Sequence, residues 1–162
     1  MTTIQAKKKI LVLRYSQFRN YDFLSEHNNI IDRLGYVWML KLGKTVPEYR
    51  MKEILAETQA IILKAPKSQG GNYLIAVFDD FYNGKAPKEL LFPNYYNEMV
   101  DTSYEYSLEG TWIKTISVRE MTNEEVKKIF LVSNDKNIED VMKSTRSALL
   151  YAYSTEDIIE EN

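Results

Sequence analysis

The sequence predicts an α+β fold: a curved, mixed β-sheet or a small β-barrel with helices packed on it. Three observations support this expectation. Several short apolar runs are bounded by Gly or Pro, as is typical of buried strands. Two stretches in the first half repeat apolar residues at helical spacing. The chain has 162 residues, a length that suits one domain with its own core, so we expect residues 1–162 to form a single unit.

The first elements follow a strand–helix–strand order. Ile10–Tyr15 is an apolar run typical of a buried strand. A helix is expected over Asp22–Leu34, because Asp22 suits an N-cap and Gly35 suits a helix end. Tyr36–Lys44 follows as a strand rich in aromatic and apolar residues. Because side chains alternate along a strand, Trp38 is expected on the face opposite its two neighbours.

The middle of the chain is expected to hold a second helix and a hairpin. The helix covers Pro47–Glu57, since proline favours the first helical position. Ala60–Lys64 and Asn72–Phe78 are expected to pair across a Gly-Gly turn. Residues 79–110 are the least regular part, and we expect a functional or decorative insertion there. Its tyrosines are Tyr95, Tyr96, Tyr104 and Tyr106.

The last third returns to regular patterns. Trp112–Val118 alternates as a half-buried strand does. Thr122 and Glu125 have the spacing of a capping box, which predicts a short helix at Asn123–Lys128. The other expected elements are a strand at Phe130–Val132, a helical turn at Ile138–Lys143, a strand at Ala148–Tyr153 and an acidic tail at Glu156–Glu161, which is either a final helix or the start of a linker.

Composition excludes several classes of protein. The net charge of −2 argues against a strongly basic, non-specific nucleic-acid binder and against an acidic DNA mimic. The chain has no cysteine, so disulfides, thiol nucleophiles and zinc–cysteine clusters are excluded. No apolar run reaches membrane-spanning length, and the first nine residues lack the apolar core of a signal peptide. We therefore expect a cytoplasmic protein without a membrane partner.

Catalytic motifs are equally sparse. No glycine-rich phosphate-binding motif and no nucleophile elbow occurs. The one histidine, His27, falls within the first predicted helix, where a partly buried structural role is favoured. Asp79-Asp80 could hold a hard cation or act as acid and base, but adjacent carboxylates at a strand end more often cap a turn. We expect no enzyme activity, no metal site and no cofactor.

Two parts of the chain have the pattern of a known fold. The opening pairs Leu13-Arg14-Tyr15-Ser16 with Gly35-Tyr36-Val37-Trp38. The closing part joins Trp112–Met121 to Leu131-Val132-Ser133-Asn134-Asp135 and Ser144-Thr145-Arg146. In pattern and spacing, residues 10–153 resemble the YTH and EVE domains of the PUA-like superfamily. YTH domains read N6-methyladenine in RNA, and EVE-like domains are associated with modified bases in DNA, including in modification-dependent restriction systems.

The resemblance implies a PUA-like barrel whose aromatic cage holds a modified base flipped out of its strand. By position, Trp38 would form one wall of the cage. Trp112 is the candidate second wall, or else part of the core beneath the closing strand. Ser16, with Tyr15 beside it, would lie at the pocket floor near the base edge. Asn134 or Asp135 would supply a polar contact to the base.

A cage alone is a weak binder. Stacking one base on an aromatic side chain contributes about 1–3 kcal/mol. Extruding the base costs about as much, a few kcal/mol. Contacts to phosphates are therefore needed, and the candidates are lysines near predicted strand ends; the alternative for each is a solvated surface. They are Lys41, Lys44, Lys64 and Lys67, with Lys7–Lys9 within reach of the backbone.

Two functions remain open at this point. The first is a nucleic-acid-binding domain that recognises a modified base, with modified DNA favoured over RNA, as the specificity module of a modification-dependent defence protein or bound to a larger effector. The second is a protein-interaction module, for example a phage or host regulator, which uses the tyrosine-rich tract as its contact surface. Tyrosines suit such surfaces because each ring brings contact area at low entropic cost.

Overall fold

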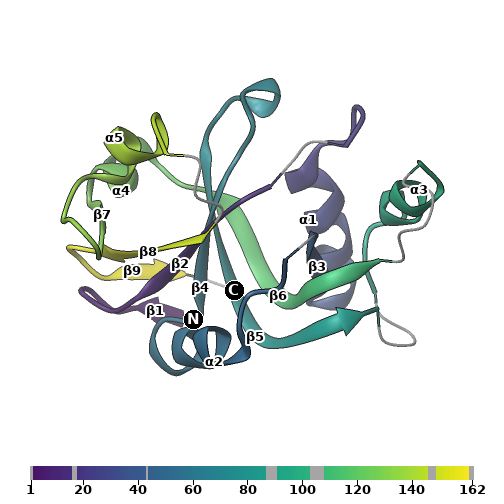
Figure 1. The fold of residues 1–162 in the computed structure, drawn as a ribbon, viewed down its shortest axis with the longest axis horizontal. Helices are drawn as coiled ribbons and strands as arrows, with labels where there is room; N and C mark the ends of the chain where they lie inside the picture. The colour runs from purple at the N-terminus through teal and green to yellow at the C-terminus, as the bar shows by residue number, and fades with distance from the viewer. Residues whose placement is uncertain are drawn as a thin grey trace.

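A computed structural model describes residues 2–15, 18–42, 44–86, 91–102, 108–145 and 149–160. Its main feature is a seven-stranded sheet in which one neighbouring pair, β2 and β4, runs parallel and the other pairs run antiparallel. The order across the sheet is β3 (Val37–Leu42), β6 (Glu109–Glu120), β5 (Tyr73–Lys85), β4 (Ala60–Lys64), β2 (Ile10–Arg14), β8 (Leu149–Ser154) and β7 (Ile129–Leu131). The fold is therefore α+β with a mixed, mostly antiparallel sheet, as the sequence predicted (Figure 1).

Both faces of the sheet are covered. Helices α1 (Phe23–Leu34) and α2 (Glu48–Glu57) share a core with one face, whose buried side chains include Leu11, Ile61 and Ala76. We call this the α1–α2 face. The opposite face, with Val12, Ile62 and Ile75, is covered at one end by α4 (Asn123–Lys127) and α5 (Ile138–Met142). We call it the α4–α5 face. A two-stranded sheet of β1 (Thr2–Ile4) and β9 (Ile158–Glu160) also packs into that core.

The predicted local signals are present. The carboxylate of Asp22 caps α1 by accepting from the Ser25 amide at 2.9 Å, and Gly35 ends the helix with φ 86°. Thr122 and Glu125 form the capping box at the start of α4. The hairpin of β4 and β5 closes through the short 3-10 helix η1 (Lys67–Gln69). These features form because all their partners lie within a few residues of one another.

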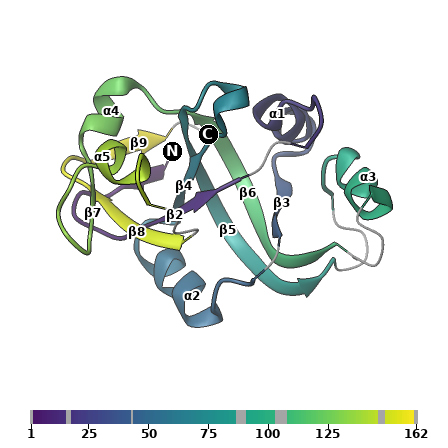
Figure 2. The ribbon, with the colours of Figure 1, turned by 45° about the horizontal axis from the view of Figure 1, so that its top comes forward.

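The region predicted as an insertion at 79–110 is more regular than expected. Strand β5 runs on to Lys85 and β6 begins at Glu109, so both strands extend well into it. Their pairing shifts register near Phe78 and Asp80, and such irregularities bend a strand pair. A further helix, α3 (Tyr95–Thr102), lies near β3 (Figures 1 and 2). At the end of the pair, a Cβ on Gly110 would lie 2.1 Å from the carbonyl oxygen of Lys41, so only glycine fits there.

Two other expectations differ from the structure. Within the described residues, β3 and β7 are the two ends of an open strand order, and no pairing closes them into a barrel. The acidic tail is neither helix nor linker, because Ile158–Glu160 forms β9 and pairs with Thr2–Ile4. That pairing joins two segments that are far apart in the sequence. No helix in the described ranges is long and apolar enough to cross a membrane.

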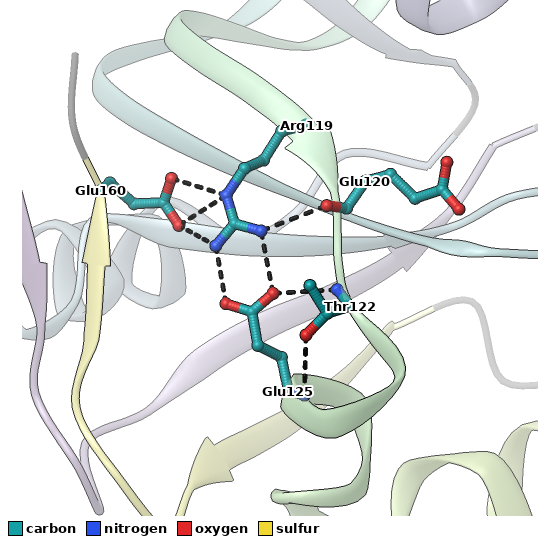
Figure 3. Close-up of polar contacts among 5 residues, drawn as sticks. All are labelled: Arg119, Glu120, Thr122, Glu125 and Glu160. Carbon is teal, nitrogen blue, oxygen red and sulfur yellow. Dashed lines mark hydrogen bonds and ion pairs between the residues drawn. The ribbon is translucent and has the colours of Figure 1, made fainter.

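A charged cluster holds β9 and α4 to the end of β6 (Figure 3). The Arg119 guanidinium donates to the Glu160 carboxylate at 2.6 Å and to the Glu125 carboxylate at 2.7 Å. It also donates to the Glu120 carbonyl at 3.1 Å. The hydrogen bond from Arg119 to Glu125, with a further one from the Thr122 amide, holds the pKa of Glu125 down at about 2. The cation is neutralised by two carboxylates, so this arginine has a structural role.

Candidate functional site

An aromatic cluster surrounds Trp112 at the β3 end of the sheet. We call it the Trp112 cluster. Its buried members come from α3, β6 and the residue before β6, and partly buried rings and aliphatic groups surround them. The buried members are Tyr95, Tyr96, Leu108 and Trp112, and the partly buried ones are Phe18, Tyr21, Trp38, Leu40, Ala86, Phe92 and Met99. The cluster thus joins side chains that lie up to 94 positions apart in the sequence, from Phe18 to Trp112.

Backbone contacts explain why the cluster forms at this edge. Among the described strands, β3 pairs with β6 alone, so its other edge needs partners for its N–H groups. The Trp38 amide donates to the Leu91 carbonyl at 2.8 Å, and the Leu40 amide donates to the Tyr96 hydroxyl at 3.3 Å. The segment before α3 and the first turn of α3 therefore cover the open edge of the sheet.

A buried polar relay ties this cover to α1. His27 is fully buried, and its Nδ1 lies 2.7 Å from the Phe23 carbonyl oxygen, which can only accept. Nδ1 therefore carries the proton, and Nε2 accepts from the Tyr96 hydroxyl at 2.5 Å. Burial lowers the pKa of His27 to about 4, so the ring is neutral at physiological pH. The histidine is structural, as the sequence favoured, and it orients Tyr96.

The two tryptophans differ in accessibility. Trp112 has 0% exposure; the ring of Phe92 lies 5.4 Å and the ring of Tyr96 lies 6.1 Å from it, centroid to centroid. The core alternative for Trp112 is therefore correct, and it is no open wall of a cage. Its indole N–H makes no hydrogen bond within the described part of the chain. Trp38 is only partly buried, at the margin of the same cluster.

Register places further groups beside Trp38 on the α4–α5 face. Two rows of paired residues cross β3, β6 and β5 in that order. The first row is Trp38, Lys114 and Asp80, and the next row on the same face is Leu40, Trp112 and Tyr82. Paired residues point to the same face. Tyr82 is 43% exposed, and Lys114 is partly exposed with its Nζ 5.0 Å from the ring centroid of Tyr36. We call Trp38, Lys114 and Tyr82 the aromatic platform.

The two described tyrosines of the expected contact tract lie inside the protein. Tyr95 is 7% and Tyr96 is 3% exposed, and they pack edge to face at 5.0 Å between centroids. Burial raises the pKa of both hydroxyls above the ordinary value. They are core residues of the Trp112 cluster and offer little surface to a partner. Tyr104 and Tyr106 lie outside the described residues.

Three other residues predicted to hold a base, Tyr15, Asn134 and Asp135, are not gathered around Trp38. Asn134 and Asp135 are exposed in the turn after β7. Strand β7 lies at the opposite end of the sheet from β3 (Figures 1 and 2). Asp135 accepts there from the Tyr153 hydroxyl at 2.8 Å. Tyr15 stacks on Phe23 at 4.1 Å on the α1–α2 face, and burial raises its pKa to about 12. Ser16 lies outside the described residues.

The predicted phosphate-binding lysines divide into two pairs. Lys41 and Lys44 lie at the end of β3, where the Lys41 ammonium donates to the Lys44 carbonyl at 2.7 Å and partial burial lowers its pKa. Lys41 shares the α1–α2 face with Met39, so it points away from the platform. Lys64 and Lys67 lie at the β4–η1 corner. The strand order therefore separates the two pairs along the sheet.

The sequence analysis did not predict two residues that the structure places at candidate sites, Tyr82 and Arg14. Tyr82 was assigned to the insertion, although it lies in β5 beside Trp112. Arg14 was given no binding role and appeared only within a strand and the opening pattern, although it neighbours Lys64 in the sheet. A charged residue that ends a wholly apolar run was the available signal for Arg14. Among the described residues, no group of three or more His, Cys, Asp or Glu side chains is arranged to hold a metal ion.

Comparison with known proteins adds no assignment: no family model, no curated protein and no solved structure matches this chain.

Proposed function

We propose that this chain is a nucleic-acid-binding domain that stacks an extruded base on the aromatic platform. The observation that carries the proposal is the partly exposed Trp38 beside Lys114 and Tyr82 on one sheet face. A sheet that presents aromatic rings is a common way to hold unpaired bases, because the rings stack on them. The Lys114 ammonium lies 3.9 Å from an Asp79 carboxylate oxygen in a partly exposed ion pair, so the two rings carry the proposed contact.

The geometry supports a platform rather than a closed cage. Trp38 and Tyr82 lie on strands that flank β6, so their backbones are about 10 Å apart across the sheet. Trp112 lies on β6 between these two strands and is fully buried, so it fills the core beneath the platform and does not itself face a ligand.

The finer assignment follows from the resemblance to YTH and EVE domains. The base we propose is a modified one, in DNA rather than RNA, and the domain is the specificity module of a modification-dependent defence or restriction system. A PUA-like barrel belongs to the same proposal. The competing interaction module loses support, since the two described tyrosines of its contact tract are buried.

Fluorescence offers a direct test, because the chain has only two tryptophans. In a Trp112→Phe background, Trp38 is the sole reporter, and a stacked base should quench it. We expect Trp38→Ala to weaken binding of single-stranded oligonucleotides by about 5- to 150-fold, the effect of losing one stacked base. Oligonucleotides with methylated adenine or cytosine, compared with unmodified ones, test the modification preference.

Tyr49→Ala is the matched control, because Tyr49 is 68% exposed on α2, away from the platform. It should leave affinity unchanged, whereas Tyr82→Ala should weaken it. Thermal melting of each variant separates loss of binding from loss of fold. Unchanged affinity in a folded Trp38→Ala variant would exclude stacking on this platform.

A further inference from the structure

Two cations lie side by side where the parallel strands β2 and β4 end. Arg14 and Lys64 are direct neighbours in the register, so their backbones are about 4.8 Å apart. Lys67 follows in η1, three residues after Lys64. Burial lowers the pKa of Lys64, and the charges of Arg14 and Lys67 lower it further. The three positive charges therefore lie close enough together to affect one another and to reach one bound anion.

Arg14 is oriented without being neutralised. Its Nη2 donates to the carbonyl oxygens of Met142 at 3.0 Å and Thr145 at 2.9 Å. Its Nε is buried and has no hydrogen-bond partner in the described part of the chain. Arg119, on the same sheet face, is instead bound by two carboxylates. In the described part of the chain, the Arg14 guanidinium contacts two carbonyl oxygens and the Met142 thioether but no carboxylate, so it keeps its positive charge in a fixed orientation.

Lys64 is held in a similar way. Its ammonium donates to the Gly71 carbonyl and lies 4.4 Å from the ring centroid of Tyr73. The acidic group whose field reaches this corner is Glu139, which acts on Lys64 and Tyr73 without an ion pair to either. No ion pair involves Arg14, Lys64 or Lys67 within the described ranges. Like charges on neighbouring strands repel, and a bound anion would offset that repulsion.

We propose that Arg14, Lys64 and Lys67 form a phosphate-binding site. A phosphate group accepts several charge-assisted hydrogen bonds at once, which suits a preoriented guanidinium with two ammonium groups beside it. The Nη1 group of Arg14 makes no hydrogen bond in the described chain, and it is the donor left for the ligand. The carboxyl ends of parallel strands are also where many α/β sheets bind phosphorylated ligands.

The site stands independently of base stacking, although the two are compatible. Alternation places Arg14, Lys64 and Tyr73 on the α4–α5 face, which also carries the aromatic platform. From Tyr73 to Asp80 the path along β5 is about 23 Å. Single-stranded nucleic acids commonly occupy sites of about 4–16 nucleotides, so one strand could engage both regions. The phosphate belongs either to such a backbone or to a free phosphorylated molecule.

The test uses the full chain, two probes and a matched control. The probes are inorganic pyrophosphate and a 12-nucleotide single-stranded DNA, titrated by calorimetry at several salt concentrations. The variants are Lys67→Gln, which is exposed and should not affect folding, and Lys64→Met, with thermal melting as a check. The control is Lys136→Gln, an exposed lysine in the turn between β7 and α5, two strands away from β2 in the sheet order.

We expect each site variant to bind about tenfold more weakly and the control to bind as the parent does. If the phosphate is part of a backbone, the DNA arm shows the loss and the salt slope falls by about 1 for each lysine removed. If the phosphate belongs to a free molecule, the variants lose affinity for pyrophosphate. Two results would overturn the site. In the first, Lys67→Gln and Lys64→Met bind both probes as tightly as the parent does. In the second, the parent binds neither probe. Loss in these variants with an unaffected Trp38→Ala keeps the phosphate site and removes the stacking proposal.

Discussion

Replacing Tyr96 with phenylalanine tests the buried relay that holds the aromatic cluster. The substitution keeps the ring and removes one hydroxyl. That hydroxyl donates to His27 Nε2 at 2.5 Å and accepts from the Leu40 amide at 3.3 Å. Its loss therefore leaves one buried acceptor and one backbone donor without partners, while the packing of the ring against Phe92 and Trp112 is preserved.

The magnitude follows from those two groups. Each buried polar group left unsatisfied costs about 1–3 kcal/mol. The new phenyl ring has no hydroxyl to desolvate, which offsets part of that cost. We expect Tyr96→Phe to lower the free energy of unfolding by about 2–4 kcal/mol. For a chain of this length, that corresponds to a melting temperature lower by about 5–15 °C.

Tyr95→Phe is the matched control, because it changes the adjacent residue of the same cluster. Tyr95 is also buried and stacks on Tyr21 at 4.8 Å between centroids, but its hydroxyl makes no hydrogen bond in the described chain. We expect its effect to stay below about 1 kcal/mol. Chemical denaturation of both variants, with equal slopes, measures the difference.

Two results would refute the reasoning. Equal destabilisation by Tyr95→Phe and Tyr96→Phe would mean that hydroxyl burial, not the relay, sets the stability. A Tyr96→Phe variant as stable as the parent would mean that the relay adds nothing, and that α3 is held by ring packing alone.

The remaining predictions concern charge. Arg119→Met should destabilise the fold by about 3–5 kcal/mol, because Glu160, 5% exposed, is left buried without a cation; adding Glu160→Leu should recover much of the loss in a double-mutant cycle. Stability should also fall as the pH drops from about 6.5 to 4. The pKa of His27 is lowered by burial to about 4 in the folded state, so the unfolded chain takes up the proton first. The free energy of unfolding should fall by about 3 kcal/mol over this range and should not change above pH 6.5. Urea midpoints measured from pH 6.5 to 4 test this. Midpoints that stay constant, or that fall equally in His27→Gln, would contradict the view that His27 causes the loss.

The local features of this protein could be predicted from the sequence. The N-cap at Asp22, the helix end at Gly35, the capping box of Thr122 and Glu125 and the β4–β5 hairpin all depend on contacts within a few residues. Helical spacing and alternation also indicated the correct α+β class. Each of these signals is complete within one stretch of chain, so no knowledge of distant segments was needed.

Strand order came only from the tertiary structure. It placed Asn134 at the opposite end of the sheet from Trp38, and it paired the acidic tail with the N-terminal strand. The role of the tyrosine-rich stretch also depends on tertiary contacts. Its polar, aromatic composition suits an exposed surface, yet Tyr95 and Tyr96 fill the space at the open edge of β3.

The candidate sites are likewise products of long-range pairing. Arg14 and Lys64 become neighbours because β2 and β4 pair in parallel across 50 residues of sequence. Trp38, Lys114 and Tyr82 share a face because three antiparallel strands align in one register. Composition and spacing indicate which side chains suit each role, but burial and hydrogen bonding with distant strands decide which of them remain available to a ligand.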